Sequence, residues 1–167
     1  MVLTREEVRA VLQRLDGVPR LMAVLLYGAG LRLLECGRLR AKDVDLATNQ
    51  LTIRDGKGHK DPATMLATAV KADLLTHLER VRRQHDDDLR HGPGWVELPG
   101  ALLRKYPNAG RAWGWRWVLP ATRIYVDRVI SQHRRHYLSD RRQARTLGGN
   151  RSTDLTREVL EHAGTHS

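Results

Sequence analysis

The sequence predicts a mainly helical α+β fold with one small antiparallel sheet. Apolar residues recur at helical spacing near the N-terminus and again over residues 69–90. Between these stretches, residues 50–54 and 62–66 flank the run Asp55-Gly56-Lys57-Gly58, whose residue types favour a tight turn and therefore a β-hairpin. A chain of 167 residues, of which 41% are hydrophobic, suits one domain with a sizeable core.

Helices are predicted before the hairpin. Thr4 and Glu7 have the spacing of a capping box, which marks the start of the first helix. The second helix is almost wholly apolar and must therefore be buried. Gly28 and Gly30 interrupt it ahead of a short third helix. The predicted ranges are residues 4–16, 21–27 and 31–39.

A long amphipathic helix is predicted after the hairpin, over residues 69–90. Its valines and leucines share one face, so His77 and Arg80 are expected on the solvated face. The run Asp86-Asp87-Asp88 is expected to be the solvated end of this helix.

The stretch from residue 91 to residue 120 differs in composition, because it holds all four Trp and four of the six Pro residues. We predict a short helix over 99–105 and an extended segment over 113–118. The alternating Trp residues of that segment would form either part of the core or a surface for a partner. Residues 123–145 are strongly basic and are predicted to be helical, and a last amphipathic helix is predicted over 153–163.

The overall charge favours a polyanionic partner. The chain has 29 Lys+Arg against 19 Asp+Glu, a formal net charge of +10, and 24 of its cations are Arg. Arg binds phosphate in a bidentate manner, although solvated surface arginines are the alternative interpretation.

The single cysteine, Cys36, excludes an intrachain disulfide and a cysteine-rich zinc site. The longest apolar stretch, residues 21–34, is too short to span a bilayer, so no membrane partner is expected.

Two residues stand out as candidates for chemistry. Arg32 follows a buried helix and a Gly-x-Gly break, and Glu35 is close enough in sequence to brace it. The alternative is a buried structural Arg32–Glu35 pair. Lys57 lies at the predicted hairpin tip between two glycines, which allow the backbone to approach a ligand closely. The alternative is a solvated turn lysine.

Together with their surroundings, these residues resemble the tyrosine recombinases, the phage integrase family. The segment LYGAGLRLLE resembles the family's first arginine box, and IRDGKGHKD resembles its β-hairpin with the catalytic lysine. A narrower group, the integron integrases, has an insertion with Leu-Pro, Arg-Lys-Tyr-Pro and Trp-rich patterns similar to those of this chain. The resembling segments are residues 26–35, 39–45, 53–61, 98–99, 103–107, 113–118 and 134–139.

The resemblance implies site-specific DNA strand exchange through a 3′-phosphotyrosyl intermediate, without a metal or other cofactor. Arg32 would hold the non-bridging oxygens of the scissile phosphate, and Lys57 would protonate the leaving 5′-oxygen. Glu35 and Asp43 would be structural. DNA contacts are expected from Arg40, Arg54, Lys60, Trp95, Arg104, Arg111, Arg116, Arg134 and Arg135.

The resemblance also implies partners and a location. They are recombination-site DNA, including folded single strands, and other recombinase protomers, in the bacterial cytoplasm with the nucleoid. In integron integrases the insertion helps to recognise unpaired bases, and Trp95 is the best candidate here for stacking on such a base. Core packing is the alternative role for the Trp residues.

We expect an incomplete domain. Residues 1–145 match part of the catalytic domain, with the insertion at about 91–120, and residues 146–167 form a divergent tail with a short helix. The family's N-terminal core-binding domain, its His-x-x-Arg box and its nucleophilic Tyr are not found. The expected function is DNA binding in DNA integration and recombination, without cleavage by this chain alone, so its status as an enzyme is left open. The alternatives are a non-catalytic DNA-binding module and a non-functional product of a decayed integrase gene.

Overall fold

The computed structural model describes residues 4–54 and 61–138. The α+β prediction is confirmed, since helices dominate and the strands form small antiparallel sheets. The predicted hairpin turn with Lys57 and Lys60, and the predicted tail from residue 146 onward, lie outside the described residues. In chain order the elements are α1 (Arg5–Arg14), α2 (Gly17–Ala29), α3 (Leu33–Gly37), the 3₁₀ turn η1 (Ala41–Asp43), β1 (Val44–Asp45), β2 (Gln50–Thr52), β3 (Ala63–Met65), α4 (Thr68–His91), α5 (Gly100–Lys105), the 3₁₀ turns η2 (Ala109–Arg111) and η3 (Trp113–Trp115), β4 (Pro120–Asp127) and β5 (Gln132–Tyr137).

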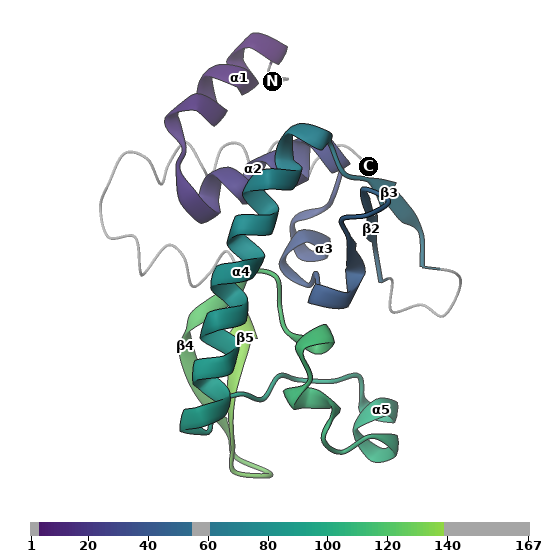
Figure 1. The fold of residues 1–167 in the computed structure, drawn as a ribbon, viewed down its shortest axis with the longest axis vertical. Coiled ribbons are helices and arrows are strands. Elements are labelled where there is room, and N and C mark those ends of the chain that lie inside the picture. Colours follow the sequence, from purple (N-terminus) through teal and green to yellow (C-terminus); the bar gives the residue numbers. More distant parts are fainter. Residues whose placement is uncertain (1–3, 55–60, 139–167) are drawn as a thin grey trace.

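Helix α4 organises the molecule (Figure 1). It runs along the long axis, with α2 and the three-stranded sheet beside its first half and the β4–β5 hairpin beside its second half. The largest cluster of buried apolar residues joins α2, the sheet and α4, and it includes Val118 and Leu119 from residues 91–120, the predicted insertion. The insertion therefore contributes to the core.

The N-terminal helices follow their local signals. Thr4 caps α1 as predicted, because its Oγ1 accepts from the backbone N–H of Glu7 at 3.3 Å and Glu7 Oε2 accepts from the Thr4 N–H at 2.7 Å. The apolar α2 is buried along one side. Gly28 lies inside α2, contrary to the prediction, and Gly30 alone ends it, with a φ of 65° that suits glycine.

The predicted hairpin is confirmed on both sides of its turn. The sheet has the order β1-β2-β3 and all pairs are antiparallel. Leu51 at its centre is completely buried and pairs with Val44 on one side and Thr64 on the other. A backbone hydrogen bond of 2.8 Å from Ile53 N–H to the Pro62 carbonyl continues the pairing toward the turn.

Two predictions for the polar side chains of α4, those for His77 and Asp88, were wrong, whereas Arg80 and Asp87 are exposed as predicted. His77 and Asp88 are buried, at 5% and 6% exposure, and so is His85. Their positions continue the spacing of the buried Val70, Leu74 and Val81. The helical period therefore places them on the packed face, where each must find a polar partner.

The second half of the insertion also differs from the prediction. α5 is present as expected, but residues 113–115 form a 3₁₀ turn rather than an extended segment. The described part of the basic stretch, residues 123–138, contributes to the antiparallel β4–β5 hairpin instead of a helix. Its first strand carries Thr, Ile, Tyr and Val, which favour β structure.

Candidate functional site

Arg32 lies at an exposed turn between two helices. After Gly30 the chain is extended at Arg32, with φ −74° and ψ 155°, and α3 starts at the next residue. Glu35 Oε2 accepts from the backbone N–H of Arg32 at 2.7 Å, so Glu35 stabilises the start of α3. Among the described residues the Arg32 guanidinium has no ion-pair partner. Glu35, which was expected to pair with this guanidinium, binds the backbone of Arg32 instead. The guanidinium is thus available to an external anion.

The base of the hairpin that carries Lys57 is held by Arg54. Its Nε donates to Asp43 Oδ1 at 2.6 Å, and its Nη1 lies 3.4 Å from Asp61 Oδ2. Asp43 is buried and its Oδ2 also accepts from the backbone N–H of Arg40 at 3.0 Å. Asp43 therefore ties the residue before the turn to η1, while the Arg54 side chain stays 45% exposed.

One hydrogen bond joins the hairpin to the Arg32 turn. Thr64 Oγ1, on β3, donates to the Ala29 carbonyl at the end of α2 at 3.0 Å. The strand that follows residues 55–60 is therefore attached three residues before Arg32. The fold thus joins the described second arm of the predicted hairpin to the turn that carries Arg32.

Arg40 is not a surface DNA contact, contrary to the sequence expectation. Its side chain is buried and donates to the carbonyl oxygens of Trp115 at 2.8 Å and Glu97 at 2.7 Å. Its guanidinium carbon lies 3.7 Å from the Trp117 ring centroid. Burial lowers the pKa of Arg40 to about 10, so it remains a cation at neutral pH. It fastens the insertion to the segment after α3.

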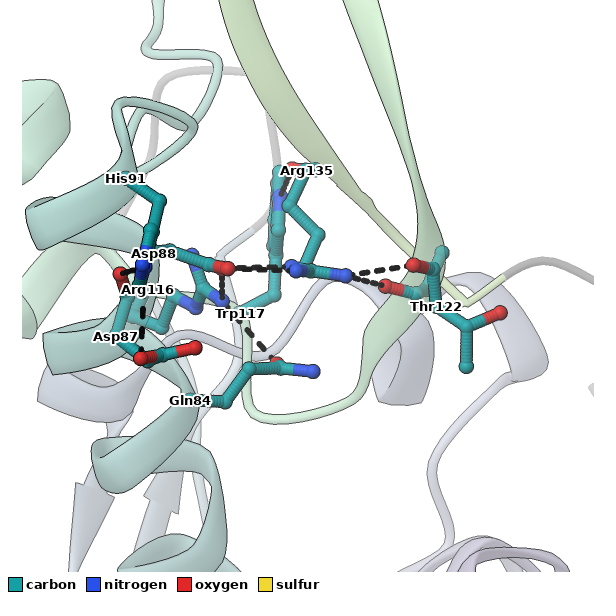
Figure 2. Close-up of polar contacts among 9 residues, drawn as sticks. Gln84, Asp87, Asp88, His91, Arg116, Trp117, Thr122 and Arg135 are labelled. Atoms are coloured by element: carbon teal, nitrogen blue, oxygen red, sulfur yellow. Dashed lines mark hydrogen bonds and ion pairs between the residues drawn. The ribbon is translucent and has the colours of Figure 1, made fainter.

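Arg116 and Arg135 are also interior residues, and both bind Asp88 (Figure 2). Arg135 donates from Nε to Asp88 Oδ2 at 2.8 Å and from Nη2 to Oδ1 at 2.7 Å. Arg116, with no exposed surface, donates from Nη2 to Asp88 Oδ2 and to Gln84 Oε1. Burial alone would raise the pKa of Asp88, but hydrogen bonds from Arg135 and Arg116 outweigh it and the pKa is lowered. One carboxylate therefore balances two buried cations.

Arg134 is the remaining buried arginine of the expected DNA contacts. Its Nη1 lies 2.9 Å from Asp127 Oδ2, and its Nε and Nη2 donate to Gln132 Oε1. Arg134 therefore closes the β4–β5 hairpin on itself. Arg104 and Arg111, by contrast, are exposed on the insertion and remain free to contact a ligand.

The Trp residues of the insertion lie against cations and partly in the core. Lys42 Nζ is 3.0 Å from the Trp115 ring centroid, and Arg82 is 4.9 Å from that of Trp113. Trp117 is buried, and its Nε1 donates to the Arg135 carbonyl at 3.2 Å. Trp95 is half-buried, with the Arg111 guanidinium 5.6 Å from its ring. The core-packing interpretation holds for Trp117, and Trp95 keeps part of its surface.

Sequence reasoning missed the residues that hold the insertion in place. The run of three aspartates predicts a solvated Asp88, and this prediction is wrong. The spacing of the buried positions of α4 is the signal that could have found it. Likewise His77 Nε2 lies 2.7 Å from the Val118 carbonyl, which connects α4 to the insertion.

Within the described ranges, no cluster of His, Cys, Asp or Glu could hold a metal ion. In the same part of the chain, no helix has the length and apolar character needed to cross a bilayer.

The chain belongs to the phage integrase family, whose model matches residues 1–98. An integrase/recombinase of Escherichia coli and one of Pseudomonas aeruginosa are each 38% identical over 168 residues, covering 100% of this chain and 50% of the relative. Tyrosine recombinase XerA of Thermococcus onnurineus is 38% identical over 119 residues, covering 62% of this chain and 40% of the relative. A crystal structure of XerA recombinase is similar with a TM-score of 0.45 and 26% identity, covering 50% of this chain and 31% of that chain. The chain thus spans about half the length of the curated relatives that it matches over its whole length.

Proposed function

We propose that this chain binds recombination-site DNA as part of an integron-integrase-type tyrosine recombinase, with Arg32 and Lys57 acting on the scissile phosphate. The observation that carries the proposal is the exposed Arg32 guanidinium, without an ion-pair partner among the described residues, on a turn attached to the hairpin of Lys57. In this function Arg32 neutralises charge on the non-bridging phosphate oxygens. Lys57 gives its proton to the leaving 5′-oxygen.

The proposed DNA-contacting set is smaller than the sequence expectation. It comprises Arg32, Arg54, Arg104 and Arg111, which are exposed, together with Lys57 and Lys60 of the predicted hairpin turn. The four buried arginines are assigned to the fold instead. Phosphate contacts of this kind position the protein without reading bases, so we expect weak sequence preference.

The test is the affinity for a fluorescein-labelled duplex, measured by anisotropy over a range of salt concentrations. Each neutralised phosphate contributes a slope of about −0.9 to the plot of log affinity against log salt. Arg32→Ala should make the slope shallower by about one such step. Arg83→Ala, which removes the same charge from an exposed position of α4, is the control and should change it less. Equal changes in both variants would indicate diffuse attraction and refute a phosphate contact at Arg32.

We further propose that the 167-residue chain does not cleave DNA by itself. Its Tyr residues are Tyr27, Tyr106, Tyr125 and Tyr137. Burial raises the pKa of Tyr125, which is the opposite of activation, and Tyr137 packs edge-on against Trp117 with ring centroids 5.1 Å apart. Incubation with a nicked suicide substrate should give no covalent adduct on a denaturing gel. An adduct would reveal a nucleophile that the proposal lacks.

The base-stacking role is proposed for Trp95, whose ring is partly exposed beside Arg111. A base stacked on an aromatic ring contributes roughly 1–3 kcal/mol. Trp95→Ala should therefore weaken binding to a hairpin with bulged bases more than binding to a plain duplex of equal length. If both affinities fall together, or only thermal stability drops, Trp95 is a packing residue.

A further inference from the structure

The helix that follows Arg32 is in direct contact with the end of the β4–β5 hairpin. Gly37, the last residue of α3, is buried against Tyr137 and Leu138. A Cβ atom at Gly37 would lie 3.1 Å from the Leu138 carbonyl oxygen and 3.3 Å from Tyr137 Cδ2. A side chain at this position therefore requires the hairpin end to move by a few tenths of an ångström.

The hairpin end is fixed on its other side as well. The Leu138 N–H donates to the Leu119 carbonyl at 2.8 Å, and Tyr137 pairs with Pro120. The Tyr137 ring packs against Trp117, and the Arg38 guanidinium lies 5.7 Å from its centroid. Tyr137 is therefore a fixed surface on which α3 rests.

Helix α3 is too short to absorb a shift along its length. It has five residues, so Arg32 and Gly37 are about 7.5 Å apart at 1.5 Å per residue. The Cys36 N–H donates to the Arg32 carbonyl at 2.9 Å, and Glu35 holds the Arg32 N–H. These bonds make the residues from Arg32 to Gly37 one rigid unit.

We propose that Tyr137 is a positioning residue for Arg32 and acts through its contact with Gly37. The Thr64–Ala29 hydrogen bond holds the chain on the N-terminal side of Arg32, and Tyr137 holds it on the C-terminal side. The end of the β4–β5 hairpin thus sets where the guanidinium points. The effect on DNA rests on the proposed function of Arg32, whereas the positioning itself does not.

The first measurement needs no DNA. The Nε–Hε NMR signal of Arg32 is assigned by its loss in Arg32→Ala. It should shift in Tyr137→Ala and in Gly37→Ala, and it should stay in place in Tyr137→Phe, which keeps the ring. Gly37→Ala carries the test if Tyr137→Ala does not fold. An Arg32 signal that is unchanged in a folded variant of either kind overturns the proposal.

The second measurement is a double-mutant cycle on the labelled duplex. Tyr137→Ala should reduce the salt slope as Arg32→Ala does, and combining the two should cause no further change. A purely structural role for Tyr137 would lower affinity equally with and without Arg32, and that result would overturn the coupling. If Arg32→Ala leaves the slope unchanged while the NMR signal still shifts in Tyr137→Ala, the proposed function fails and the positioning stands.

Discussion

Replacing Asp88 by Asn tests whether one carboxylate holds the insertion on α4. In the described part of the chain, Asp88 is the sole ion-pair partner of Arg116 and Arg135. The side chains of Asp88, Arg116 and Arg135 are 8%, 0% and 7% exposed, so neither arginine can recover the lost interaction by contact with water. The variant therefore leaves two buried cations without a counter-charge.

Removing one partner of a buried ion pair costs about 3–5 kcal/mol. Asn keeps one oxygen acceptor for the arginines, so we expect a loss of about 3 kcal/mol in the free energy of unfolding. A loss of about 3 kcal/mol lowers the Tm of a domain of this size by roughly 6–12 °C. Urea denaturation followed by circular dichroism measures the first quantity, and a thermal melt measures the second.

Two further variants separate this mechanism from a general effect of charge. Asp87→Asn removes the same charge from a side chain that is 65% exposed, and it should change stability by less than about 0.5 kcal/mol. Adding Arg116→Met to Asp88→Asn should recover part of the loss, because Nε and Nη1 of Arg116 are already buried without a hydrogen-bond partner among the described residues. A single Asp88→Asn variant within about 1 kcal/mol of the parent would refute the reasoning.

Three other predictions follow from local contacts. Thr4→Ala should lower the free energy of unfolding by about 1 kcal/mol, because the backbone N–H of Glu7 loses its acceptor at the start of α1. Burial lowers the pKa of His77 and of His85, so on acidification the unfolded chain binds protons before the folded chain does. The free energy of unfolding should therefore fall as pH drops below about 6.5. A double variant, His77→Gln with His85→Gln, should show a flatter dependence of stability on pH. Burial raises the pKa of the Cys36 thiol to about 12, so alkylation should be slow until urea unfolds the chain, and rapid native labelling would contradict this.

The features that sequence predicted correctly are those with local causes. The Thr4 cap and the strands beside the hairpin turn depend on residues only a few positions apart. The turn at Arg32 could likewise be expected from Gly30 and the buried helix before it. Such signals are present in the chain before any tertiary contact forms.

The features that sequence missed depend on distant partners. Asp88 is buried because it pairs with Arg116 and Arg135, which lie 28 and 47 residues away along the chain. Its neighbours in sequence, Asp86 and Asp87, instead suggest an exposed position. The sequence likewise suggests DNA contacts for the buried Arg40, Arg116, Arg134 and Arg135, since charge alone does not reveal which cations have internal partners. The β4–β5 hairpin was missed because its many arginines obscured the β-favouring residues between them.

The packing of Val118 and Leu119 has a consequence for protein engineering. The predicted insertion, residues 91–120, is a natural target for excision in order to obtain a minimal domain. Here excision of residues 91–120 would remove the fully buried Val96, Val118 and Leu119, and the carbonyl oxygens that bind Arg40 and His77. A shortened version would therefore need new apolar side chains to fill that space, and a non-polar residue in place of Arg40.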